Sequence, residues 1–563
     1  MRDGVRVAMS LWFPGGERPA EPAPTILVQT RYGRARMFPR FRRFVNEGYV
    51  LAAVDTRGST ASFGPRRVDI GPGEIGDMDE LISHLASRPW SNGEVFAQGT
   101  SYMADTADIA TSRPAESLKG AIIRQVDFDV FLHLFFPGGV ANQWFLDGWG
   151  GATKAMDEGR SPDPEADLNC LERIADCAAL WPLLSPVDED ADFVMLRQAL
   201  AGRQRWEADD YAVTEFHDDA GRNGFGFFDS APAAQLDGIR REAKPAQVWG
   251  SWLDGGTAEA ALARYRSAPG VPMEVWITGN DHGNAQLADP FMPAGDAPRP
   301  SIDEQHRIMA EFYASVSEGG FDRRVINYYV LGAGVFRQSS VWPPADTQED
   351  ILYFDAAGAL VRELPAPGVD TYEVDFSAST GPETRWSTQF GTPPDYPDRR
   401  REDEKLLVYD SAPFRDAAEI AGTPVVELHV ASATADPVFH VYLEDVAPDG
   451  RVTYLTEGLF RAVHRAEADP AGLPYDMGPA PHSFRRADAM PVRTGERMEV
   501  RFGLFPVAAR IRSGHRLRVA IAGADRAYFR RYSEGREETY RVSRGGEAAS
   551  LVSLPIRMPV PSQ

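Results

Sequence analysis

Residues 95–110 read VFAQGTSYMADTADIA, a short apolar run followed by small turn residues and a helix-like segment. This pattern predicts a buried strand that turns sharply into a helix at Ser101. Such a turn exposes a serine hydroxyl above a parallel sheet and leaves the next backbone N–H groups unpaired, where they can stabilise an oxyanion. The alternative is that Ser101 only caps the helix. Gly-x-Ser alone is weak, since Ser161 also fits it, but the strand-to-helix context favours Ser101 as a nucleophile.

The segments around this turn alternate between apolar runs and helix-like stretches. The apolar runs end in polar or turn residues, as buried parallel strands do, and they lie at residues 25–29, 49–55, 95–98, 121–125, 246–252 and 273–278. Helix-like patterns separate or follow them at residues 40–47, 74–87 and 302–317. The alternation predicts an α/β protein with a parallel sheet.

The strand rhythm stops between residues 127 and 240, where stretches such as 171–184 and 193–201 have helical patterns. A helical insertion between strands of one sheet is the simplest explanation. From about residue 341 onward, short β-like runs follow one another without helices, which predicts an antiparallel sandwich. We therefore expect a catalytic domain at residues 1–126 and 241–340, a helical cap at 127–240 and a C-terminal β-sandwich at 341–563.

Composition narrows the function classes. The chain has 563 residues and a formal net charge of −23, which argues against nucleic acid or an anionic membrane as a partner because both favour a basic face. A solvated acidic surface is the main expectation, although acidic pocket walls could favour a cationic substrate. No apolar stretch of about 18 residues occurs, and residues 1–13 lack the apolar region of a signal peptide, so a cytoplasmic protein is expected. Cys170 and Cys177 are expected to be buried free thiols, since on one helix they would lie too far apart to bridge.

A serine nucleophile needs a base to take its proton and an acid to orient that base. His282 follows the apolar run at 273–278, where a loop at the carboxyl end of a last parallel strand would carry it to the elbow. The other histidines after the elbow in the catalytic half are less well placed. His133 and His217 lie in the insertion, and His306 lies in a helical pattern.

The acid has three candidates. Asp254 is favoured because it follows the penultimate strand-like run and precedes two glycines. Asp127 is its rival, because the strand before it should neighbour the elbow strand, and Asp281 is less favoured because adjacent side chains point apart. The order Ser101, Asp254, His282 is the order that an α/β-hydrolase sheet imposes.

Several longer motifs make the whole chain resemble the bacterial cocaine-esterase-like serine hydrolases, which are related to X-Pro dipeptidyl-peptidases and α-amino-acid ester hydrolases. The motifs are RDGVRVAMSLWFP at 2–14, TRYGR at 30–34, GYVLAAVDTRGSTASFG at 48–64, RPWSNGEVFAQGTSY at 88–102, SWLDGG at 251–256 and NYYVLGAGVFRQSSVWPP at 327–344. The resemblance implies an α/β-hydrolase domain with a helical cap inserted after the sixth strand, and a C-terminal jelly-roll domain.

The same resemblance implies roles for individual residues. Ser101 is similar to the family nucleophile, Asp254 to its acid and His282 to its base. Tyr32 is similar to the tyrosine whose hydroxyl forms the oxyanion hole together with the backbone N–H after the nucleophile, which here belongs to Tyr102. A strand-end aromatic without a catalytic role is the alternative for Tyr32.

The chain departs from the family pattern at two places. Ala104 stands where the family elbow has its second glycine, which adds one methyl group. The usual Gly-Pro-Trp-x-His loop is replaced by Gly279-Asn280-Asp281-His282, which is one residue shorter and has no tryptophan. His282 should still reach the serine, but substrate preference does not transfer from the family.

We expect a serine hydrolase that acts on a small-molecule ester or amide without a metal or an organic cofactor, and we leave open whether it forms a homo-oligomer. One alternative is an X-Pro dipeptidyl-peptidase or an α-amino-acid ester or amide hydrolase, in which cap carboxylates such as Asp188, Glu189 and Asp190 would pair with a substrate ammonium. The alternative from another class is a catalytically inactive binding protein with a decayed triad.

Overall fold

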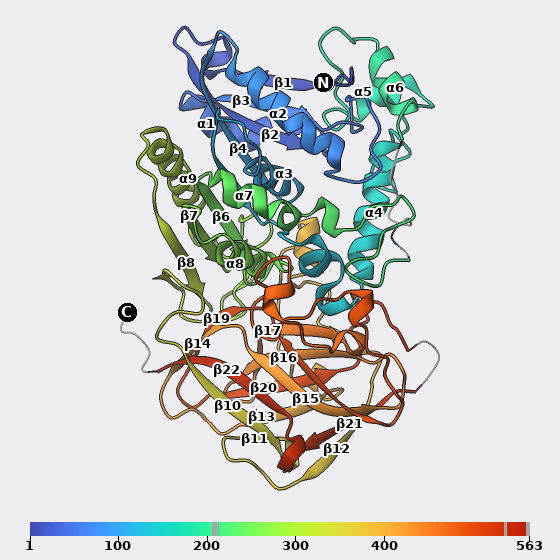
Figure 1. Cartoon of the computed structure of the whole chain (residues 1–563), viewed down its shortest axis with the longest axis vertical. Coiled ribbons are helices and arrows are strands. Elements are labelled where there is room, and N and C mark those ends of the chain that lie inside the picture. The colour runs from blue at the N-terminus through green and yellow to red at the C-terminus, as the bar shows by residue number, and fades with distance from the viewer. Residues whose placement is uncertain (205–210, 212, 534–536, 559–563) are drawn as a thin grey trace.

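Figure 1 shows the computed structural model, which describes residues 1–204, 211, 213–533 and 537–558. One sheet with its helices occupies the upper part of this view, and a β-rich unit occupies the lower part. The helical insertion runs along one side, from the upper part towards the β-rich unit. The predicted α/β-hydrolase fold with a C-terminal β domain is confirmed.

The hydrolase sheet has nine strands in the order β1-β3-β2-β4-β5-β6-β7-β8-β9. Its edge strands β1 and β9 pair antiparallel, and the strands between them run parallel. Each predicted apolar run matches one of these strands, and none extends beyond its strand by more than one residue. Their bounds are β1 Met9–Trp12, β2 Ala23–Thr30, β3 Val50–Asp55, β4 Ser91–Thr100, β5 Leu118–Arg124, β6 Ala246–Ser251, β7 Met273–Thr278, β8 Arg324–Val330 and β9 Val335–Ser339. The sequence predicted that His282 follows the last parallel strand. This prediction is wrong, because His282 follows β7 and β8 is also parallel.

Helices cover both faces of this sheet. One face packs against α2 (Pro72–Ala86), α3 (Tyr102–Ala110) and α8 (Thr257–Ser267). The other face packs against α1 (Phe38–Asn46) and α9 (Ile302–Ser317). Since both faces are covered, the parallel strands read as continuous apolar runs rather than alternating ones.

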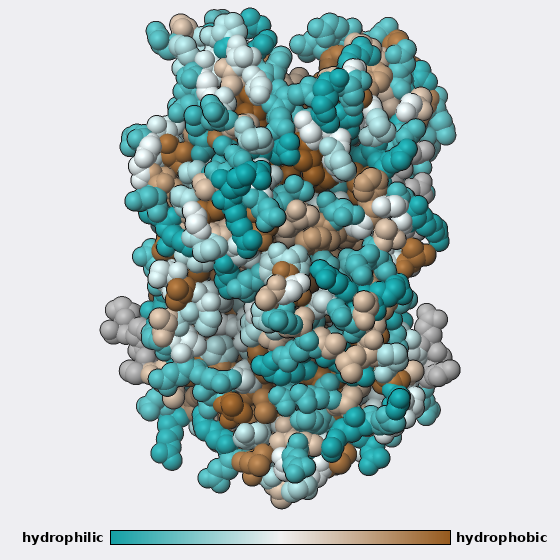
Figure 2. All heavy atoms as spheres, in the orientation of Figure 1, coloured by the Kyte–Doolittle hydropathy of each residue, from teal (hydrophilic) through white to brown (hydrophobic). Residues whose placement is uncertain are grey.

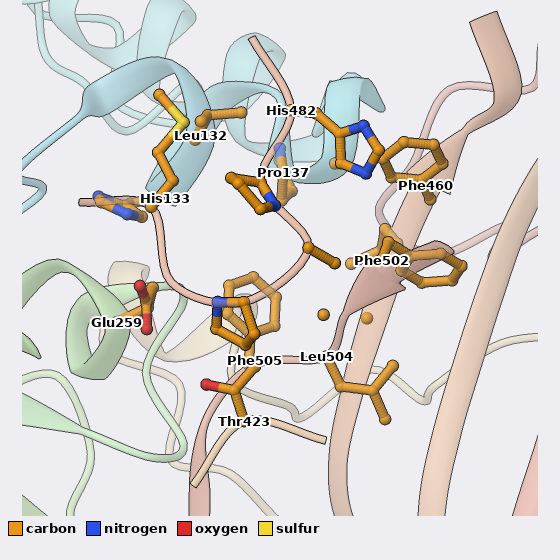
Figure 3. Close-up of a pocket in the computed structure, with 18 of the residues that line it drawn as sticks. Leu132, His133, Pro137, Glu259, Thr423, Phe460, His482, Phe502, Leu504 and Phe505 are labelled. Carbon is orange, nitrogen blue, oxygen red and sulfur yellow. The ribbon is translucent and has the colours of Figure 1, made fainter. Parts of the chain in front are cut away.

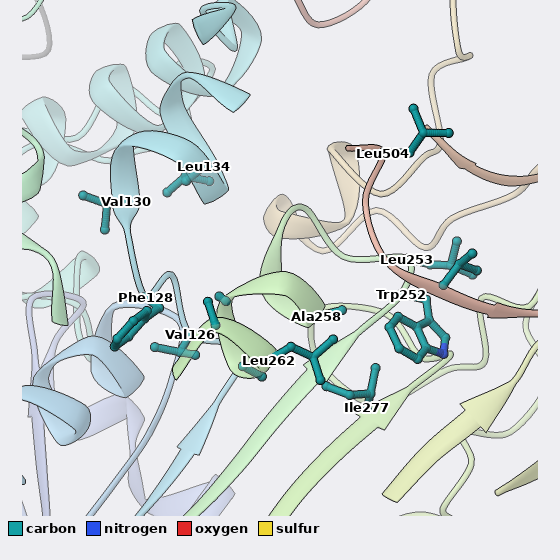
Figure 4. Close-up of a cluster of buried hydrophobic side chains, with 14 of the residues drawn as sticks. Val126, Phe128, Val130, Leu134, Trp252, Leu253, Ala258, Leu262, Ile277 and Leu504 are labelled. Atoms are coloured by element: carbon teal, nitrogen blue, oxygen red, sulfur yellow. The ribbon is translucent and has the colours of Figure 1, made fainter. Parts of the chain in front are cut away.

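The main core continues from the sheet into the insertion. Figure 4 shows Leu262 of α8 and Ile277 of β7 close to each other, and the insertion residues Phe128 and Leu134 belong to the same buried cluster. A close-packed core has little freedom to rearrange. The ends of β4 to β7, which carry the predicted site, are therefore fixed by the core beneath them.

The insertion lies between β5 and β6, directly after the strand that follows the elbow strand β4. The bounds of its helices are α4 Gln143–Asp157, α5 Ile174–Ala179, α6 Val194–Ala201 and α7 Leu236–Glu242, with a π-helical turn at Phe131–Phe135. The helix expected at residues 171–184 is shorter. Asn169 Oδ1 accepts the N–H groups of Leu171 and Glu172 in a turn before it, and Pro182 disfavours helix near its other end.

The expectation of two free thiols is wrong, because Cys170 and Cys177 form a disulfide with their Cα atoms 4.4 Å apart. The prediction assumed that both residues lie on one continuous helix. In the structure α5 begins at Ile174, and Cys170 lies in the turn before it. That turn brings the two cysteines within bonding distance. The bond lies in a small buried cluster against which Tyr32 also packs.

The C-terminal unit is one hydrogen-bonded array of 13 strands. The strand bounds are β10 Gln348–Asp355, β11 Ala359–Val361, β12 Gly368–Glu373, β13 Leu407–Ser411, β14 Ala418–Gly422, β15 Val425–Ser432, β16 Val438–Val446, β17 Val452–Arg461, β18 Arg497–Gly503, β19 Val507–Ile511, β20 Arg516–Ala522, β21 Thr539–Arg544 and β22 Leu551–Arg557, and the helix α10 spans Arg400–Asp403. A β-bridge between Leu331 and Ala509 ties this unit to the end of β8. The β domain is thus anchored to the hydrolase sheet.

The face of the molecule in Figure 2 is mainly hydrophilic, with apolar residues scattered over it in small groups. Within the described part of the chain, no helix combines the length and apolar character that crossing a bilayer requires.

Candidate active site

Ser101 occupies a strained elbow between β4 and α3. Its backbone has φ 62° and ψ −136°, a conformation that residues with a side chain seldom adopt. A Cβ atom at Gly99 would lie 2.1 Å from the backbone of Met103, so the turn needs glycine there. The Ser101 hydroxyl makes no capping hydrogen bond to α3. The reading of this serine as a simple helix cap is therefore wrong.

The residues after the serine fit the elbow despite the departure at Ala104. Met103 is buried on the α1 and α9 side of the sheet, and Ala104 is buried in the main core. The side chain of Tyr102 is turned inward, where its hydroxyl donates to Glu74 at 2.6 Å and accepts from Arg66 at 2.7 Å. Its backbone N–H stands at the first position of α3, where a helix offers no acceptor.

The imidazole of His282 is hydrogen-bonded to the carboxylate of Asp254. The imidazole Nδ1 lies 3.0 Å from Asp254 Oδ1 and 2.8 Å from Oδ2, and Asp254 is fully buried. Burial alone would lower the pKa of His282, but the charge and hydrogen bond of Asp254 outweigh burial and raise it above its ordinary value. The arrangement leaves Nε2 as the nitrogen that faces away from the carboxylate.

The short loop before His282 is held by its own hydrogen bonds. Asn280 Oδ1 accepts the N–H of Arg299 at 2.9 Å, and Asn280 Nδ2 donates to the Arg299 carbonyl at 3.0 Å. Ser251 at the end of β6 donates to the Asn280 carbonyl at 2.6 Å. These contacts fix the loop without the tryptophan of the family pattern.

Ser101, His282 and Tyr32 all line one cleft of about 910 Å³. Ser101 and His282 make no hydrogen bond to each other in this structure. Such catalytic bonds are often long in free enzymes and tighten when substrate binds. The structure thus brings Ser101, His282 and Tyr32 to one cleft, and the imidazole of His282 is hydrogen-bonded to the buried carboxylate of Asp254.

Tyr32 has a partner that the sequence did not indicate. The indole Nε1–H of Trp149, in α4, donates to the Tyr32 hydroxyl at 2.9 Å. The phenol oxygen accepts in this bond, so its own hydrogen stays available as a donor. Burial raises the pKa of Tyr32 to about 12, which keeps the phenol protonated. A tryptophan from the cap therefore orients the hydroxyl beside the cleft.

The rival acids do not reach the imidazole. Asp281 Oδ1 accepts the N–H groups of Ala285 and Gln286 in its own loop. Asp127 lines the cleft, but its Oδ1 is buried without a hydrogen-bond partner among the described residues. Burial first, and then the charge of Asp254, raise the pKa of Asp127 to about 8.

The rival histidines have other partners. His217 Nε2 lies 2.8 Å from Asp129 Oδ2, and His133 Nδ1 accepts the N–H of Asp129. His306 lines the outer cleft, where it lies 2.7 Å from Glu47 Oε1.

The cap carboxylates proposed for a substrate ammonium are not at the site. Asp190 is buried and accepts the N–H groups of Met195 and Leu196 at the start of α6. Asp188 and Glu189 are exposed and line neither recess beside Ser101. They give no support to the amino-acid ester or peptidase alternative.

A segment near the start of the β domain reaches the site from more than a hundred residues away. The Thr388 hydroxyl accepts the backbone N–H of His282 at 2.9 Å. Arg385 Nε donates to the carbonyl of Gly255 at 2.9 Å, directly after Asp254. Residues 384–390 therefore brace both loops that carry the imidazole and its acid.

Ser101 also borders a second, smaller recess of about 70 Å³. Its walls are mainly aromatic and aliphatic side chains from the cap, with two buried acids, Asp105 and Asp127, among them. Burial raises the pKa of both acids, that of Asp127 to about 8, so a protonated Asp127 carboxyl is favoured there at neutral pH. We call this recess the inner pocket.

A third pocket, of about 120 Å³, lies between the insertion and the β domain, as Figure 3 shows. His133, Glu259 and His482 line it together with Phe460 and Phe505. Ser101 does not line it, so this pocket is separate from the candidate site.

Two family profiles cover most of the chain. The X-Pro dipeptidyl-peptidase S15 family matches residues 3–284, and the X-Pro dipeptidyl-peptidase C-terminal non-catalytic domain matches residues 320–552. The chain is 32% identical to a Mycobacterium bovis protein named as a serine esterase, over 99% of this chain and 94% of that protein. It is 24% identical to the cocaine esterase of Rhodococcus sp., over 99% and 97% of the two chains.

Solved structures share the fold over nearly the whole chain. A CocE/NonD family hydrolase of Staphylococcus aureus has a TM-score of 0.71 at 16% identity, covering 99% of this chain and 92% of its own. An α-amino acid ester hydrolase has a TM-score of 0.70 at 19% identity, covering 99% and 95%.

Proposed function

Because the chain belongs to the X-Pro dipeptidyl-peptidase S15 family of serine hydrolases, we propose that it hydrolyses carboxylic esters through an acyl-enzyme on Ser101. The observation that carries this proposal is the strained elbow of Ser101 in one cleft with an imidazole that is bonded to a buried carboxylate. Each part has a defined task in acyl transfer.

In the acylation half, His282 Nε2 takes the proton of the Ser101 hydroxyl as the serine oxygen attacks the ester carbon. Asp254 fixes the tautomer and stabilises the imidazolium that forms. The Tyr32 hydroxyl and the Tyr102 N–H donate to the oxyanion of the tetrahedral intermediate. When the intermediate collapses, the bond to the leaving oxygen breaks and the imidazolium proton goes to the leaving alcohol.

In the second half, a water oxygen attacks the acyl carbon while His282 takes a proton from that water molecule. The bond to Ser101 breaks, the serine oxygen regains its proton from the imidazolium, and a carboxylic acid leaves. An ester is the favoured substrate because an alkoxide or phenolate leaves more readily than an amine. No described carboxylate from the Asp188–Asp190 stretch reaches the site to hold the ammonium of a peptide substrate.

The proposal is tested with a fluorophosphonate probe and two substrates. The probe should label wild-type protein on the peptide that contains Ser101, and p-nitrophenyl butyrate should be hydrolysed much faster than a Gly-Pro anilide. Absence of labelling, under conditions that label a known serine hydrolase, would favour the inactive binding protein. Faster cleavage of the anilide would favour the peptidase.

A further inference from the structure

The cleft beside Ser101 is rich in arginine although the chain as a whole is acidic. The arginines that line it are Arg36, Arg40, Arg42, Arg43 and Arg124. The first four lie on or just before α1, at one wall of the cleft, and the last lies at the end of β5. A chain with net charge −23 has many acids with which to neutralise such a group, so the partners of these arginines need to be accounted for.

Most of these arginines have no acidic partner. Arg43 pairs with Asp303 at 2.6 Å. Among the described residues, no carboxylate lies within 4 Å of the guanidinium of Arg36, Arg40 or Arg42. Although the side chain of Arg40 is exposed, partial desolvation in the cleft first, and then the like charge of Arg36, lower its pKa. The wall thus presents positive charges that repel one another.

Arg124 contacts the elbow through its backbone. Its backbone carbonyl accepts the N–H of Ser101 at 3.0 Å. Its guanidinium stacks on Trp249 at 5.3 Å and donates to Gln305 Oε1 at 2.7 Å. The Nε–H of Arg124 is buried without a partner among the described residues. Burial first, and then the charge of Arg40, lower the pKa of Arg124 to about 10.

The acids around the cleft do not cancel this charge. Asp281 attracts Arg124 only at a distance, since its Oδ1 accepts backbone N–H groups of its own loop. Glu47 is engaged by His306. The carboxyl of Asp127, with its pKa raised by burial, favours the neutral form at neutral pH. Among the described residues, Arg36, Arg40, Arg42 and Arg124 therefore lie at the cleft without a carboxylate in direct contact, and a bound anion would supply that contact.

We propose that this cleft binds an ester whose leaving group carries a carboxylate, and that Arg40 and Arg124 hold that carboxylate. The proposal rests on Ser101 being the nucleophile, as argued above. A guanidinium offers paired donors whose geometry matches a carboxylate, and a partly desolvated site strengthens that pairing.

The sizes of the two recesses place the anion on the leaving-group side. The inner pocket of about 70 Å³ has apolar walls and fits a short acyl chain. The cleft of about 910 Å³ is larger and carries the arginines. Ser101 and Tyr32 line both recesses, so the scissile bond lies where they meet.

A matched pair of esters tests the proposal. The butyrate ester of 4-hydroxybenzoate carries the carboxylate, and the butyrate ester of 4-hydroxybenzamide is its neutral counterpart. The kcat/KM of each ester is divided by the rate constant of its hydroxide-catalysed hydrolysis, which corrects for intrinsic reactivity. For the wild type, the corrected value of the carboxylate ester should exceed that of the amide by about tenfold or more, and added salt should reduce this preference. Equal rates for the two esters would overturn the proposal.

Variants test which arginines cause the preference for the carboxylate ester. Arg40→Gln and Arg124→Gln should each reduce the preference about fivefold to tenfold. Arg307→Gln removes an exposed arginine of α9 that pairs with Glu311 and does not line the cleft, so it should keep the wild-type preference. Because Arg124 is packed on Trp249 and its variant could fail to fold, the exposed Arg40 supplies the second test. A preference unchanged in Arg40→Gln would contradict the assignment.

Two further measurements separate this proposal from the function on which it rests. Hydrolysis of p-nitrophenyl butyrate without any carboxylate preference would leave the esterase intact and overturn the anion site. Failure to hydrolyse any ester, together with failure of fluorophosphonate labelling, would overturn both. A preference for mono-p-nitrophenyl glutarate over p-nitrophenyl butyrate, with none in the benzoate pair, would place the anion on the acyl side and contradict the proposal.

Discussion

The two recesses that meet at Ser101 differ in size, walls and charge. The inner pocket is small and apolar, and its buried acids Asp105 and Asp127 have raised pKa values. The cleft is an order of magnitude larger and is lined by arginines, of which only Arg43 forms an ion pair with a carboxylate among the described residues. Ser101, the proposed nucleophile, therefore faces two environments that suit different chemical groups.

The recesses also come from different parts of the chain. The inner pocket is formed mainly by the insertion and the start of α3. The cleft is formed by α1, α4 and α9, with Gln389 and Phe390 contributed by the β domain. Both recesses share a set of lining residues, namely Tyr32, Ser101, Asp127, Leu134, Phe145 and Trp149. Changes at a residue that lines only one recess can thus alter one side of the substrate without disturbing the other, whereas changes at a shared residue affect both.

The largest effect is expected at Ser101, which lines both recesses. Ser101→Ala removes the nucleophile, so kcat/KM for both p-nitrophenyl butyrate and the benzoate ester should fall by at least about 10⁴-fold. The measurement is steady-state hydrolysis, with circular dichroism to show that the variant is folded. Retention of most of the activity would mean that another group attacks the ester.

A smaller loss is expected at Tyr32, which also lines both recesses. Tyr32→Phe removes one of the two proposed oxyanion donors, and kcat should fall by roughly ten- to a thousandfold. KM should change less, because the bond is made mainly in the transition state. The control is the melting temperature, since Phe can keep the packing of the ring against Tyr102. An unchanged kcat would remove Tyr32 from the mechanism.

The pH profile of kcat/KM reports on two groups, His282 and Asp127. His282 must be neutral to accept a proton, and its pKa is raised, so kcat/KM should fall as pH drops through a value above the usual pKa near 6.5. On the alkaline side, Asp127 ionises as pH rises through about 8. A new negative charge there would oppose the oxyanion and an anionic leaving group, so activity should decline again.

Asp127→Asn sharpens this prediction, because asparagine resembles the neutral carboxyl. The alkaline decline should disappear in the variant while the acid limb stays in place. The check is the kcat/KM profile from pH 5 to 10 for both proteins. An alkaline limb that persists in the asparagine variant would show that another group titrates there.

The elbow was predictable because its signals are local. The strand, the small residues and the helix that surround Ser101 follow one another in the sequence, and Asp254 and His282 each follow a strand whose carboxyl end must face the same edge of a parallel sheet. Their places in the fold agree with that reasoning. Their catalytic roles stay predictions.

The contacts at the candidate site that sequence reasoning missed are long-range. Trp149 meets Tyr32 across 117 positions, and Thr388 meets His282 across 106. No periodicity or spacing encodes such pairs. The sequence led to no prediction for the arginines of α1, which the fold places in one cleft with Arg124. The disulfide was missed for the opposite reason, because a regular helix was assumed across Cys170 and Cys177 where the chain makes a turn.

The smallest effect is expected from that disulfide. It closes a short loop in the cap, in the same buried cluster as Met156, which lines the cleft. Replacing both Cys170 and Cys177 with serine should lower stability by about 2 kcal/mol through the greater freedom of the unfolded loop. The melting temperature should fall by a few degrees, and reductant should lower it similarly in the wild type. Because the cluster supports the cleft wall, turnover of the benzoate ester should change more than that of p-nitrophenyl butyrate. Equal changes for both esters would show that the disulfide stabilises the cap without distinguishing between the two recesses.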